Sequence, residues 1–398
     1  MRTYRELFAV REYRLLFGTA ALGTGAGTIE RLALATVVFE RTGSPLLAAL
    51  AFLAGVLPAA VGALTLMSLA DRVRPRTFFV GMNVLRCAAV LILATGAVPV
   101  WGMLLIVMAV GLVASVGAGV SGGLLRDVVG SDGYALARST FGVLTGSMQI
   151  LGFAVGGVLL ATLSPRVAFL TVAALTAMIA VLCRLGLHDR GPRASGRGSL
   201  QLTHQGNARL LGRRGTRSLL LAAWVPNGLV VGAEALYVPH AGAGAAGLFV
   251  AAAFGMLVGD LLVGRFVPHR LRFRLVVPLR LLLAVPYLVF WADPPQPVAV
   301  LCVGVASAGF AASIALSERL LEVTPDDLQA QALGLSSSGM VTSQALGALI
   351  AGAVAEALGT GPAMTVVAAI SALVTLTLVP GLRSVSHPTA DTPTQTHP

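Results

Sequence analysis

The chain contains no lysine, since all 28 of its basic residues are arginine. Without lysine, phosphate-binding loops of the GxxxxGK type and Schiff-base catalysis are excluded. Cysteine is also scarce, and Cys87, Cys183 and Cys302 stand singly inside apolar runs. They show no pairing and no C-x-x-C spacing, so neither a disulfide framework nor a zinc site is supported, and we expect no metal.

Charged residues are also scarce. Only 11% of the 398 residues are charged, whereas about a quarter is usual in soluble domains. Hydrophobic residues reach 56%, the mean hydropathy is +0.85, and the apolar residues form runs of about 20, the length that crosses a hydrocarbon core. The sequence therefore predicts an all-α integral membrane protein. A cleavable signal is not expected, because the first apolar run is full length and carries Glu30 and Arg31.

Twelve apolar runs predict twelve transmembrane helices. Their expected ranges are roughly 15–38, 46–69, 77–97, 101–124, 138–161, 165–187, 218–238, 246–264, 273–291, 297–317, 332–355 and 363–382. We expect two six-helix bundles, 1–187 and 217–383. Residues 188–216 are polar and rich in Gly and Arg, which is typical of a linker, and the Thr-, Pro- and His-rich tail 384–398 is expected to be disordered.

The two bundles repeat each other in sequence. Residues 125–157 match 320–352 at an offset of 195, and the match includes two uncommon residue types, with Gln149 meeting Gln344. At an offset of 194, Arg86 meets Arg280. Offsets near half the chain length indicate two parallel halves that arose by duplication.

The arginines predict the orientation in the membrane. With a cytoplasmic N-terminus, 23 of them fall in cytoplasmic segments and only Arg41 and Arg166 fall outside. This asymmetry is the positive-inside rule, and it also places the C-terminus in the cytoplasm. The net charge of +11 thus reports on topology and on anionic lipids as partners, and nucleic acid is not expected.

One loop between expected helices carries a motif. Residues 69–76 read Leu-Ala-Asp-Arg-Val-Arg-Pro-Arg. Together with twelve helices in two parallel halves, this loop resembles the signature of the major facilitator superfamily, an acidic and a basic residue followed by Gly and further basic residues. Asp71, Arg72 and Arg76 match it, whereas Met67 stands where the family usually has Gly. The resemblance implies a transporter with a central cavity between two six-helix bundles and no cofactor.

Within that family, the fifth helix resembles bacterial drug and small-molecule efflux members. Residues 152–157 read Gly-Phe-Ala-Val-Gly-Gly, and Phe153 replaces the proline of the antiporter signature Gly-Pro-x-x-Gly-Gly. The arginine common in the fourth helix of proton-coupled members is also missing, because nothing between Trp101 and Leu125 is basic. Both departures weaken the case for an antiporter.

Acidic residues inside expected helices are the first candidates for a site, because a charge at a helix centre in the membrane costs about 2.5–3.5 kcal/mol. Glu30, beside Arg31, lies near mid-depth of the first helix, which lines the cavity in the family. Its carboxylate would either couple transport to protons or form an ion pair that only sets helix packing. Glu234 of the seventh helix is the second candidate, although its place nearer the outer face favours simple solvation.

Other intramembrane polar residues have two possible roles. Gln149 and Gln344 would lie near mid-depth, where an amide can bond across helices or bind a polar ligand group. Arg86 and Arg280 fall in the third and ninth helices, which are peripheral to the cavity in the family, so structural pairing is expected. Asp260 is expected to join a network at the inner end of the eighth helix.

The motif loop is also a candidate conformational gate. Asp71 would accept hydrogen bonds at the start of the eleventh helix, where the helix dipole favours negative charge. The resemblance implies that this contact closes the cytoplasmic side. The expected participants are Asp71, Arg72, Arg76, Arg126, Asp127 and Arg138. The alternative is that these charges set topology alone.

These features predict a secondary active transporter for a small amphipathic or hydrophobic solute, because the cavity helices offer few charges. Proton-coupled export is the leading hypothesis. Uptake, facilitated diffusion and a non-transporting membrane sensor are the alternatives, and an enzyme is not expected because no catalytic set converges at the membrane face. We expect a monomer in a bacterial cytoplasmic membrane, since exclusive arginine usage suits a high-GC bacterial source.

Overall fold

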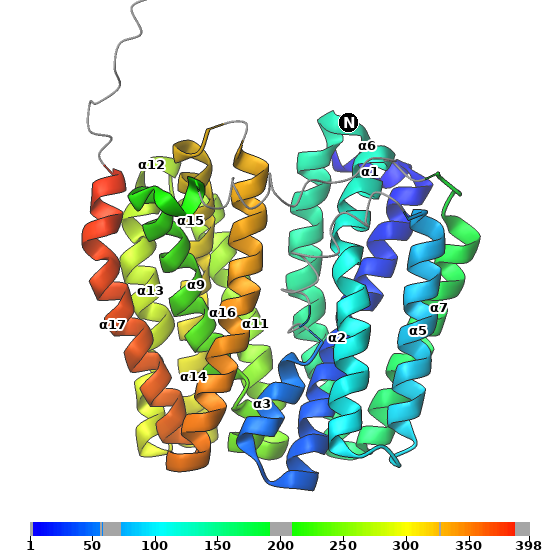
Figure 1. Ribbon diagram of the computed structural model, residues 1–398, viewed down its shortest axis with the longest axis horizontal. Coiled ribbons are helices and arrows are strands. Elements are labelled where there is room, and N and C mark those ends of the chain that lie inside the picture. Colours follow the sequence, from blue (N-terminus) through cyan, green and yellow to red (C-terminus); the bar gives the residue numbers. More distant parts are fainter. Residues whose placement is uncertain (1–2, 56–57, 59–72, 192–208, 326–327, 387–398) are drawn as a thin grey trace, which may run out of the picture.

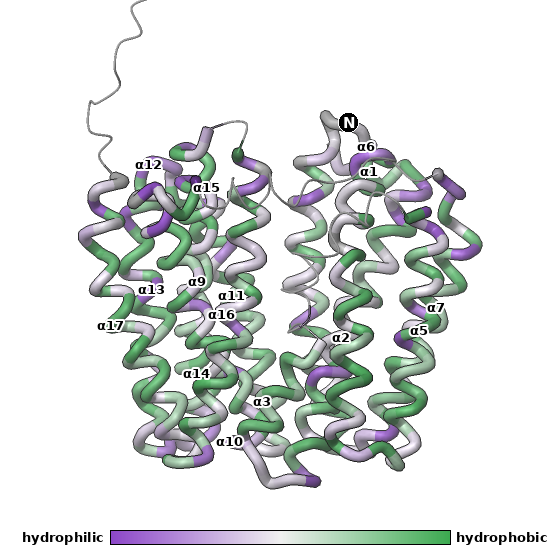
Figure 2. The backbone as a smooth tube through the Cα atoms, in the orientation of Figure 1, coloured by the Kyte–Doolittle hydropathy of each residue, from purple (hydrophilic) through white to green (hydrophobic). Residues whose placement is uncertain are grey.

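The computed structural model describes residues 3–55, 58, 73–191, 209–325 and 328–386. Helices make up nearly all of the described residues, and no strand occurs among them. Apolar runs of this length fold as helices because a backbone in hydrocarbon must satisfy its hydrogen bonds within the segment. Figure 2 shows long hydrophobic stretches along the helices, with hydrophilic residues concentrated toward their ends.

The helices form two groups that lie side by side (Figure 1). The first group, the N-half, comprises α1 (Tyr4–Ala9), α2 (Arg11–Thr42), α3 (Pro45–Leu53), α5 (Pro75–Ala94), α6 (Val100–Thr162) and α7 (Pro165–Gly186). The second group, the C-half, comprises α9 (Arg214–Glu234), α10 (Tyr237–Ala241), η2 (Gly242–Gly244), α11 (Ala245–Phe266), α12 (His269–Arg272), η3 (Phe273–Leu275), α13 (Val276–Ala284), η4 (Val285–Ala292), α14 (Gln296–Ser307), η5 (Ala308–Ala311), α15 (Ala312–Val323), α16 (Gln329–Leu358) and α17 (Thr360–Ser386).

Short local signals set the helix ends. α2 ends at Gly43, which adopts the left-handed conformation (φ 64°) that favours glycine, and its N–H bonds to the carbonyl of Phe39. The next residue, Ser44, caps α3 by accepting a hydrogen bond from the N–H of Leu47, and Pro45 occupies the first turn. The sequence thus turns the chain back through the bilayer within three residues.

A second positive-φ glycine divides the longest helix. α6 contains Gly130 at φ 71° and ψ 173°, a conformation that breaks the helical path. The two parts, 100–130 and 136–162, are each long and apolar enough to cross a membrane. The expected loop between the fourth and fifth helices is therefore mostly helical, because polar residues outside the bilayer can still continue a helix.

The helical segments follow the expected spans closely. Nine segments of the described chain are long and apolar enough to cross a membrane. The expected second helix lies mostly outside the described residues, the first is not among the nine, and the seventh and eighth fall in one segment, 215–266, so the count of twelve stays a prediction. α9 begins at Arg214, four residues before the expected start, and α17 continues to Ser386, beyond the expected 382. Hydropathy marks where a helix meets lipid, whereas the helix itself continues into water.

The two halves join near one end of the molecule. This far end, where α2 ends and α3 begins, lies opposite the end that carries the N-terminus (Figure 1). α3 packs on α16 and α6 packs on α11 across the halves. Glycines allow the close approach, since a Cβ on Gly157 would overlap the Cβ of Ala246, and one on Gly352 would lie 2.8 Å from the Cα of Leu46. The ribbons of the halves diverge toward the other end (Figure 1).

Candidate functional site

Glu30 is paired across two helices of the N-half. It lies on α2 with 7% of its surface exposed. Arg86 of α5 donates to the same carboxylate oxygen, Oε2, from Nε at 2.8 Å and from Nη2 at 2.6 Å. Charge-assisted bonds of this length are strong. The neighbour in sequence, Arg31, points elsewhere because adjacent helical residues diverge by about 100°.

Arg86 was expected to make a structural pairing at the periphery of the central cavity, and its contact with Glu30 lies inside the N-half. Arg86, Glu30 and Arg31 all line a cavity of about 260 Å³ inside the N-half, bounded by α2, α3, α5 and α6. Among the described lining residues, the two guanidinium groups exceed the single carboxylate by one positive charge.

Arg31 faces the junction of the two halves. Its guanidinium lies 5.5 Å from the centre of the Phe52 ring, within the range of a cation–π contact. Its Nε donates to the carbonyl of Gly27 at 3.4 Å. Its positive charge also interacts with the carboxylate of Glu234, so a positive charge of the N-half faces a negative charge of the C-half across the interface.

Glu234 is buried, contrary to the expectation of a solvated residue near the outer face. It is 7% exposed at the end of α9, and its Oε1 has no hydrogen-bond partner among the described residues. The hydroxyls of Tyr237 and Tyr287, bonded to each other, lie within electrostatic range of this carboxylate. The position of Glu234 along its helix did not reveal that the buried tyrosines Tyr237 of α10 and Tyr287 of η4 would lie near it.

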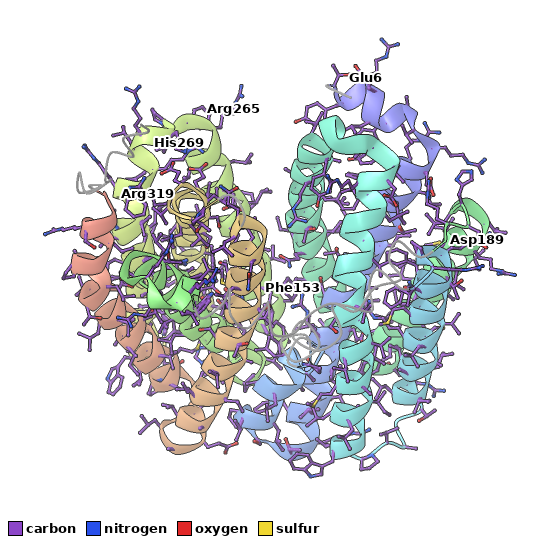
Figure 3. All side chains as sticks on the ribbon, turned by 45° about the horizontal axis from the view of Figure 1, so that its top comes forward. Glu6, Phe153, Asp189, Arg265, His269 and Arg319 are labelled. Carbon is purple, nitrogen blue, oxygen red and sulfur yellow. The ribbon has the colours of Figure 1, made fainter. Side chains whose placement is uncertain are left out.

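An aromatic layer joins the halves beside these charges. Phe153 of α6 stacks on Phe249 of α11 with ring centroids 4.4 Å apart, and Phe52 of α3 stacks on the same Phe249 at 4.9 Å. Tyr237 meets Phe249 edge-on at 4.9 Å. Figure 3 shows Phe153 between the two halves. We call Phe52, Phe153, Phe249 and Tyr237 the aromatic layer.

The aromatic layer was not predicted from the sequence, although one of its members, Phe153, lies in a motif of the fifth helix. Phe153 was identified only as a departure from a proline-containing signature. Tyrosine is scarce in this chain, with five residues in all, and Tyr237 of the layer and its partner Tyr287 are both fully buried. A buried hydroxyl in an apolar helix was the signal that could have indicated them.

The two expected mid-depth amides lie in different surroundings. Gln344 of α16 donates from Nε2 to Oδ1 of Asn227 on α9 at 3.0 Å. Gln149 lies half-buried on α6. Asn227 was also missed by sequence reasoning, although it is 5% exposed and follows Pro226 inside α9. The amide pair binds α9 to α16, as expected of interhelical polar contacts.

Arg280 and Asp260, the other intramembrane charges, lie apart from this site. Arg280 of α13 is 1% exposed, and its Nη2 donates to the carbonyl of Ala223 at 3.4 Å and to Oγ of Ser313 at 3.2 Å. Asp260 lies exposed on α11. The structure therefore brings Glu30, Arg31, Arg86 and Glu234 toward the junction and leaves these two elsewhere.

The candidate gate is described in part. Asp71 and Arg72 lie outside the described residues. Arg76 donates from Nη2 to the carbonyl of Arg184 at the end of α7, at 2.5 Å. Arg126, Asp127 and Arg138 lie exposed on α6 on either side of Gly130. Whether these groups form a gate stays a prediction.

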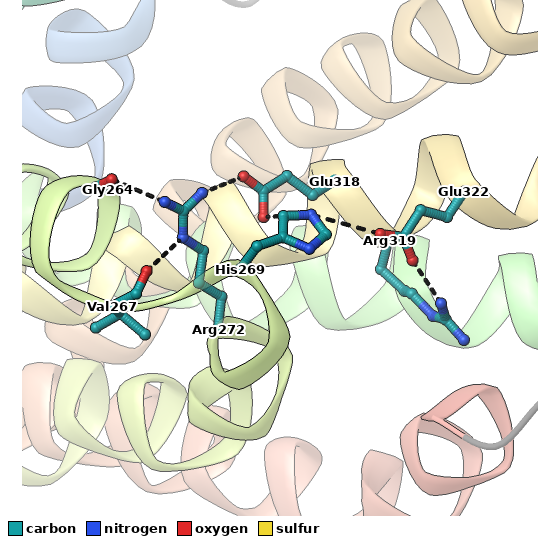
Figure 4. A network of polar contacts seen from close by, with 7 residues as sticks. All are labelled: Gly264, Val267, His269, Arg272, Glu318, Arg319 and Glu322. Carbon is teal, nitrogen blue, oxygen red and sulfur yellow. Dashed lines mark hydrogen bonds and ion pairs between the residues drawn. The ribbon is translucent and has the colours of Figure 1, made fainter.

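The corresponding loop of the C-half is held by a polar network (Figure 4). Arg272 donates to the carbonyls of Gly264 and Val267 at 2.8 and 3.0 Å and to Oε1 of Glu318 at 2.5 Å. His269 lies 3.5 Å from Glu318 and Glu322, and Arg319 bonds to Glu322 at 2.5 Å. This network ties α12 to α15 at the end that carries the N-terminus.

At the far end, a carboxylate of one half meets a helix start of the other. Glu356 of α16 bonds to the hydroxyl of Ser44 and accepts from the N–H of Leu46 at 3.4 Å. The position is favourable because the start of α3 carries the positive end of the helix dipole. We call the contact between Glu356 and Ser44–Leu46 the far-end latch.

In chemical terms, the junction combines two opposed charges, an aromatic layer and an adjacent cavity. This arrangement can bind a small molecule with an apolar body and a polar group, and a buried carboxylate can exchange a proton. Among the residues that the structure describes, no three His, Cys, Asp or Glu side chains gather as a metal-binding group.

Several solved structures that are similar to this chain are transporters. The chain is similar to the nucleoside transporter NupG, with 13% identity, a TM-score of 0.70 and coverage of 93% of this chain and 98% of that one. A POT family transporter in complex with 5-aminolevulinic acid gives 10% identity, a TM-score of 0.73 and coverage of 94% and 96%. An inward-facing bacterial homologue of the human lysosomal transporter Spinster gives 15%, 0.64 and 95% of both chains. At these identities the likeness shows the fold alone.

The comparison of sequences identifies the family. No curated protein matches the chain by sequence. The profile of the Major Facilitator Superfamily matches residues 15–319, more than half of the chain. The multiple membrane-spanning helices agree with that match. This multi-pass membrane protein therefore belongs to the Major Facilitator Superfamily.

Proposed function

We propose that this protein exports a small amphipathic solute in exchange for protons, by alternating access between its two halves. The observation that carries the proposal is the buried Glu234, whose Oε1 has no hydrogen-bond partner in the described part of the chain. A buried carboxylate whose hydrogen bonds are incomplete can bind or release a proton when its surroundings change. Rocking of the halves would supply that change.

The coupling residue in this proposal is Glu234, with Glu30 second. Glu30 is already neutralised by two short bonds from Arg86, so its release requires the loss of that pair. Glu234 instead opposes Arg31 across the interface. Movement of the halves would directly change the distance between Glu234 and Arg31, whereas the Glu30–Arg86 pair lies within one half.

The solute in this proposal has an apolar or aromatic body. The aromatic layer presents stacked rings at the junction, and such rings bury large apolar area. Gln149 and Gln344 supply amides on the two halves, and Arg31 and Glu234 supply one charge of each sign. The partners are therefore a small molecule, protons and membrane lipids, and the transporting unit is a monomer.

The same proposal sets the orientation and the order of the domains. Two six-helix bundles, 1–187 and 217–383, are joined by a cytoplasmic linker at 188–216 and followed by the tail at 384–398, with both termini in the cytoplasm of a bacterium. The far end is then external, and the far-end latch closes it. The inner gate of Asp71 and Arg72 against the start of α16 would form when the protein opens outward.

Flux in proteoliposomes under an imposed pH gradient tests this function. The panel contains lipophilic cations and neutral aromatic drugs, together with a nucleoside and 5-aminolevulinic acid because similar structures are named for them. Wild type is compared with Glu234→Gln, which keeps the shape of the side chain but cannot ionise. We expect gradient-driven flux of at least one amphipathic compound, lost in the variant, with gradient-free exchange of labelled solute retained.

Two comparisons complete the test. Glu40→Gln removes an exposed carboxylate of α2 at the far end and should keep the response to the pH gradient. Reversal of the imposed gradient separates export from uptake, because an exporter moves solute against the inward flow of protons. Proton-driven flux that persists in Glu234→Gln would contradict the assignment, and the absence of flux for every compound would favour the sensor alternative.

A further inference from the structure

Arg270 and Arg274 line a cavity beside the polar network of the C-half. The cavity has a volume of about 280 Å³ and lies between α12, η3 and α15. It is large enough for several water-sized groups. Both arginines are exposed, and neither has a hydrogen-bond or ion-pair partner in the described part of the chain. Their N–H donors are therefore available to a ligand in the cavity.

The carboxylates that line this cavity are already neutralised. Glu318 accepts from Arg272 and Glu322 accepts from Arg319, each at 2.5 Å, and Figure 4 shows both bonds. Once these two pairs are set aside, the formal charge that remains in the lining comes from the two unpartnered arginines. The cavity therefore favours an anion over a cation.

The N-half uses the corresponding positions differently. At the offset of 194 between the halves, Arg76 corresponds to Arg270 and Val80 corresponds to Arg274. Arg76 donates to the carbonyl of Arg184 at the end of α7. The C-half thus has one guanidinium that is not engaged in such a bond and a second guanidinium where the N-half has an apolar side chain.

The cavity lies where membrane-spanning segments begin and end. The segment His269–Ala292 begins at the cavity and the segment Gln296–Val323 ends there, and both are long and apolar enough to cross a membrane. Phe266 and Leu271, close by in the chain, are 73% and 46% exposed. Arginines next to exposed apolar side chains are typical of the membrane–water interface. Basic pockets between membrane helices at this depth bind the head groups of anionic lipids.

We propose that Arg270 and Arg274 bind the phosphate group of an anionic phospholipid in this cavity. The oxygens of a phosphate match the forked N–H donors of a guanidinium, and Phe273 lines the cavity as an apolar contact for the glycerol. In the orientation proposed above, the lipid belongs to the cytoplasmic leaflet. The site goes beyond the proposed transport function, because none of its lining residues belongs to the junction of the halves.

Thermal unfolding of the delipidated full chain in dodecyl maltoside tests the site without any transport. Phosphatidylglycerol, phosphatidylcholine and inorganic phosphate are titrated separately. Wild type should become more stable with phosphatidylglycerol in a saturable way and should respond to neither of the others. Equal stabilisation by inorganic phosphate would assign the site to free phosphate and overturn the lipid assignment. Equal stabilisation by phosphatidylcholine would show that the anionic head group is not recognised.

Variants link the effect to the residues. Arg270→Gln and Arg274→Gln should each weaken the apparent affinity for phosphatidylglycerol about tenfold, the usual effect of losing a hydrogen bond to a charged group. Both changes lie at exposed positions, where substitutions seldom prevent folding. The matched control, Arg265→Gln with Arg383→Gln, removes two exposed arginines that lie outside the cavity lining at the same end. An equal loss of affinity in the control would show that net charge at this end, and not the cavity, attracts the lipid.

Discussion

Glu30 of α2 and Arg86 of α5 form a two-bonded ion pair, with Nε and Nη2 of the arginine at 2.8 and 2.6 Å from one carboxylate oxygen. The side chains are only 10% and 19% exposed. Both charges are removed from water, which costs free energy. The pair is stable because the geometry of its two short hydrogen bonds offsets that cost. Its role in stability can be separated from any role in transport.

The first prediction concerns this pair. Glu30→Gln or Arg86→Met alone should destabilise the protein by about 3–5 kcal/mol, because each leaves a buried group without its partner. The double variant Glu30→Met with Arg86→Met should recover most of this loss, since two apolar side chains of similar length need no partner. Apparent melting temperatures in detergent give the comparison.

The same variants separate the alternatives for Glu30. If the pair only sets helix packing, the double variant should transport under a pH gradient as wild type does. A stable double variant that has lost proton-driven flux would instead assign coupling to Glu30. Single variants no less stable than wild type would show that the pair is not the buried contact described here.

The helices and the family could be predicted from the sequence because both depend on local pattern. Apolar runs of about 20 residues and the arginine distribution need no knowledge of distant contacts. The partner of Glu30 could be predicted only with knowledge of distant contacts. Sequence offers Arg31 as its neighbour, whereas the bonded partner, Arg86, lies 56 positions away and is reached only when α2 and α5 pack.

The burial of Glu234 also depends on tertiary packing and could not be predicted from the sequence. Its place near the outer face suggested contact with water, yet Glu234 is only 7% exposed and the fully buried Tyr237 follows it in the chain. Depth along a helix says nothing about what the chain places over that position after it turns. The aromatic layer was hidden for a related reason, because Phe52, Phe153 and Phe249 come from three helices and stack only across the junction.

The second prediction concerns pH and the start of α2. Glu12 accepts from both terminal nitrogens of Arg190, at 2.5 and 2.6 Å, and from the N–H of His188 at 3.2 Å. Burial acts to raise the pKa of the Glu12 carboxyl, but Arg190 and His188 outweigh it, so the pKa lies below the ordinary value of 4.5. A lowered folded-state pKa adds stability that is present above about pH 4.5 and is lost as the pH falls through the folded-state value.

Melting temperatures between pH 7 and pH 3 check this. Wild type should lose stability below about pH 4.5, and Glu12→Gln should lose less over the same range while starting lower by about 1.5–3 kcal/mol, the value of hydrogen bonds to a charged group. Both are measured in a His188→Gln background, which removes the neighbouring imidazole from the titration. Parallel curves for the two proteins would show that Glu12 does not contribute.

The third prediction concerns the far-end latch. Glu356 lies near the end of α16 and meets the start of α3 at Ser44 and Leu46. We propose that Asp71, beyond the other end of the same expected second helix, meets the start of α16. Two carboxylates would thus close opposite ends of one helix pair, and each contact would form in only one conformation.

Glu356→Gln should therefore increase the population that is open at the far end. An exposed contact of a carboxylate with a helix start is worth about 0.3–1 kcal/mol, which corresponds to a two- to fivefold change in the equilibrium. Spin labels at the exposed Leu163 and Leu358 of a cysteine-free chain would report this as a longer-distance fraction in double electron–electron resonance. Glu40→Gln removes the same charge from an exposed position on α2 and is the matched control. A distance distribution that changes equally in both variants would mean that net charge at this end, and not the latch, sets the balance.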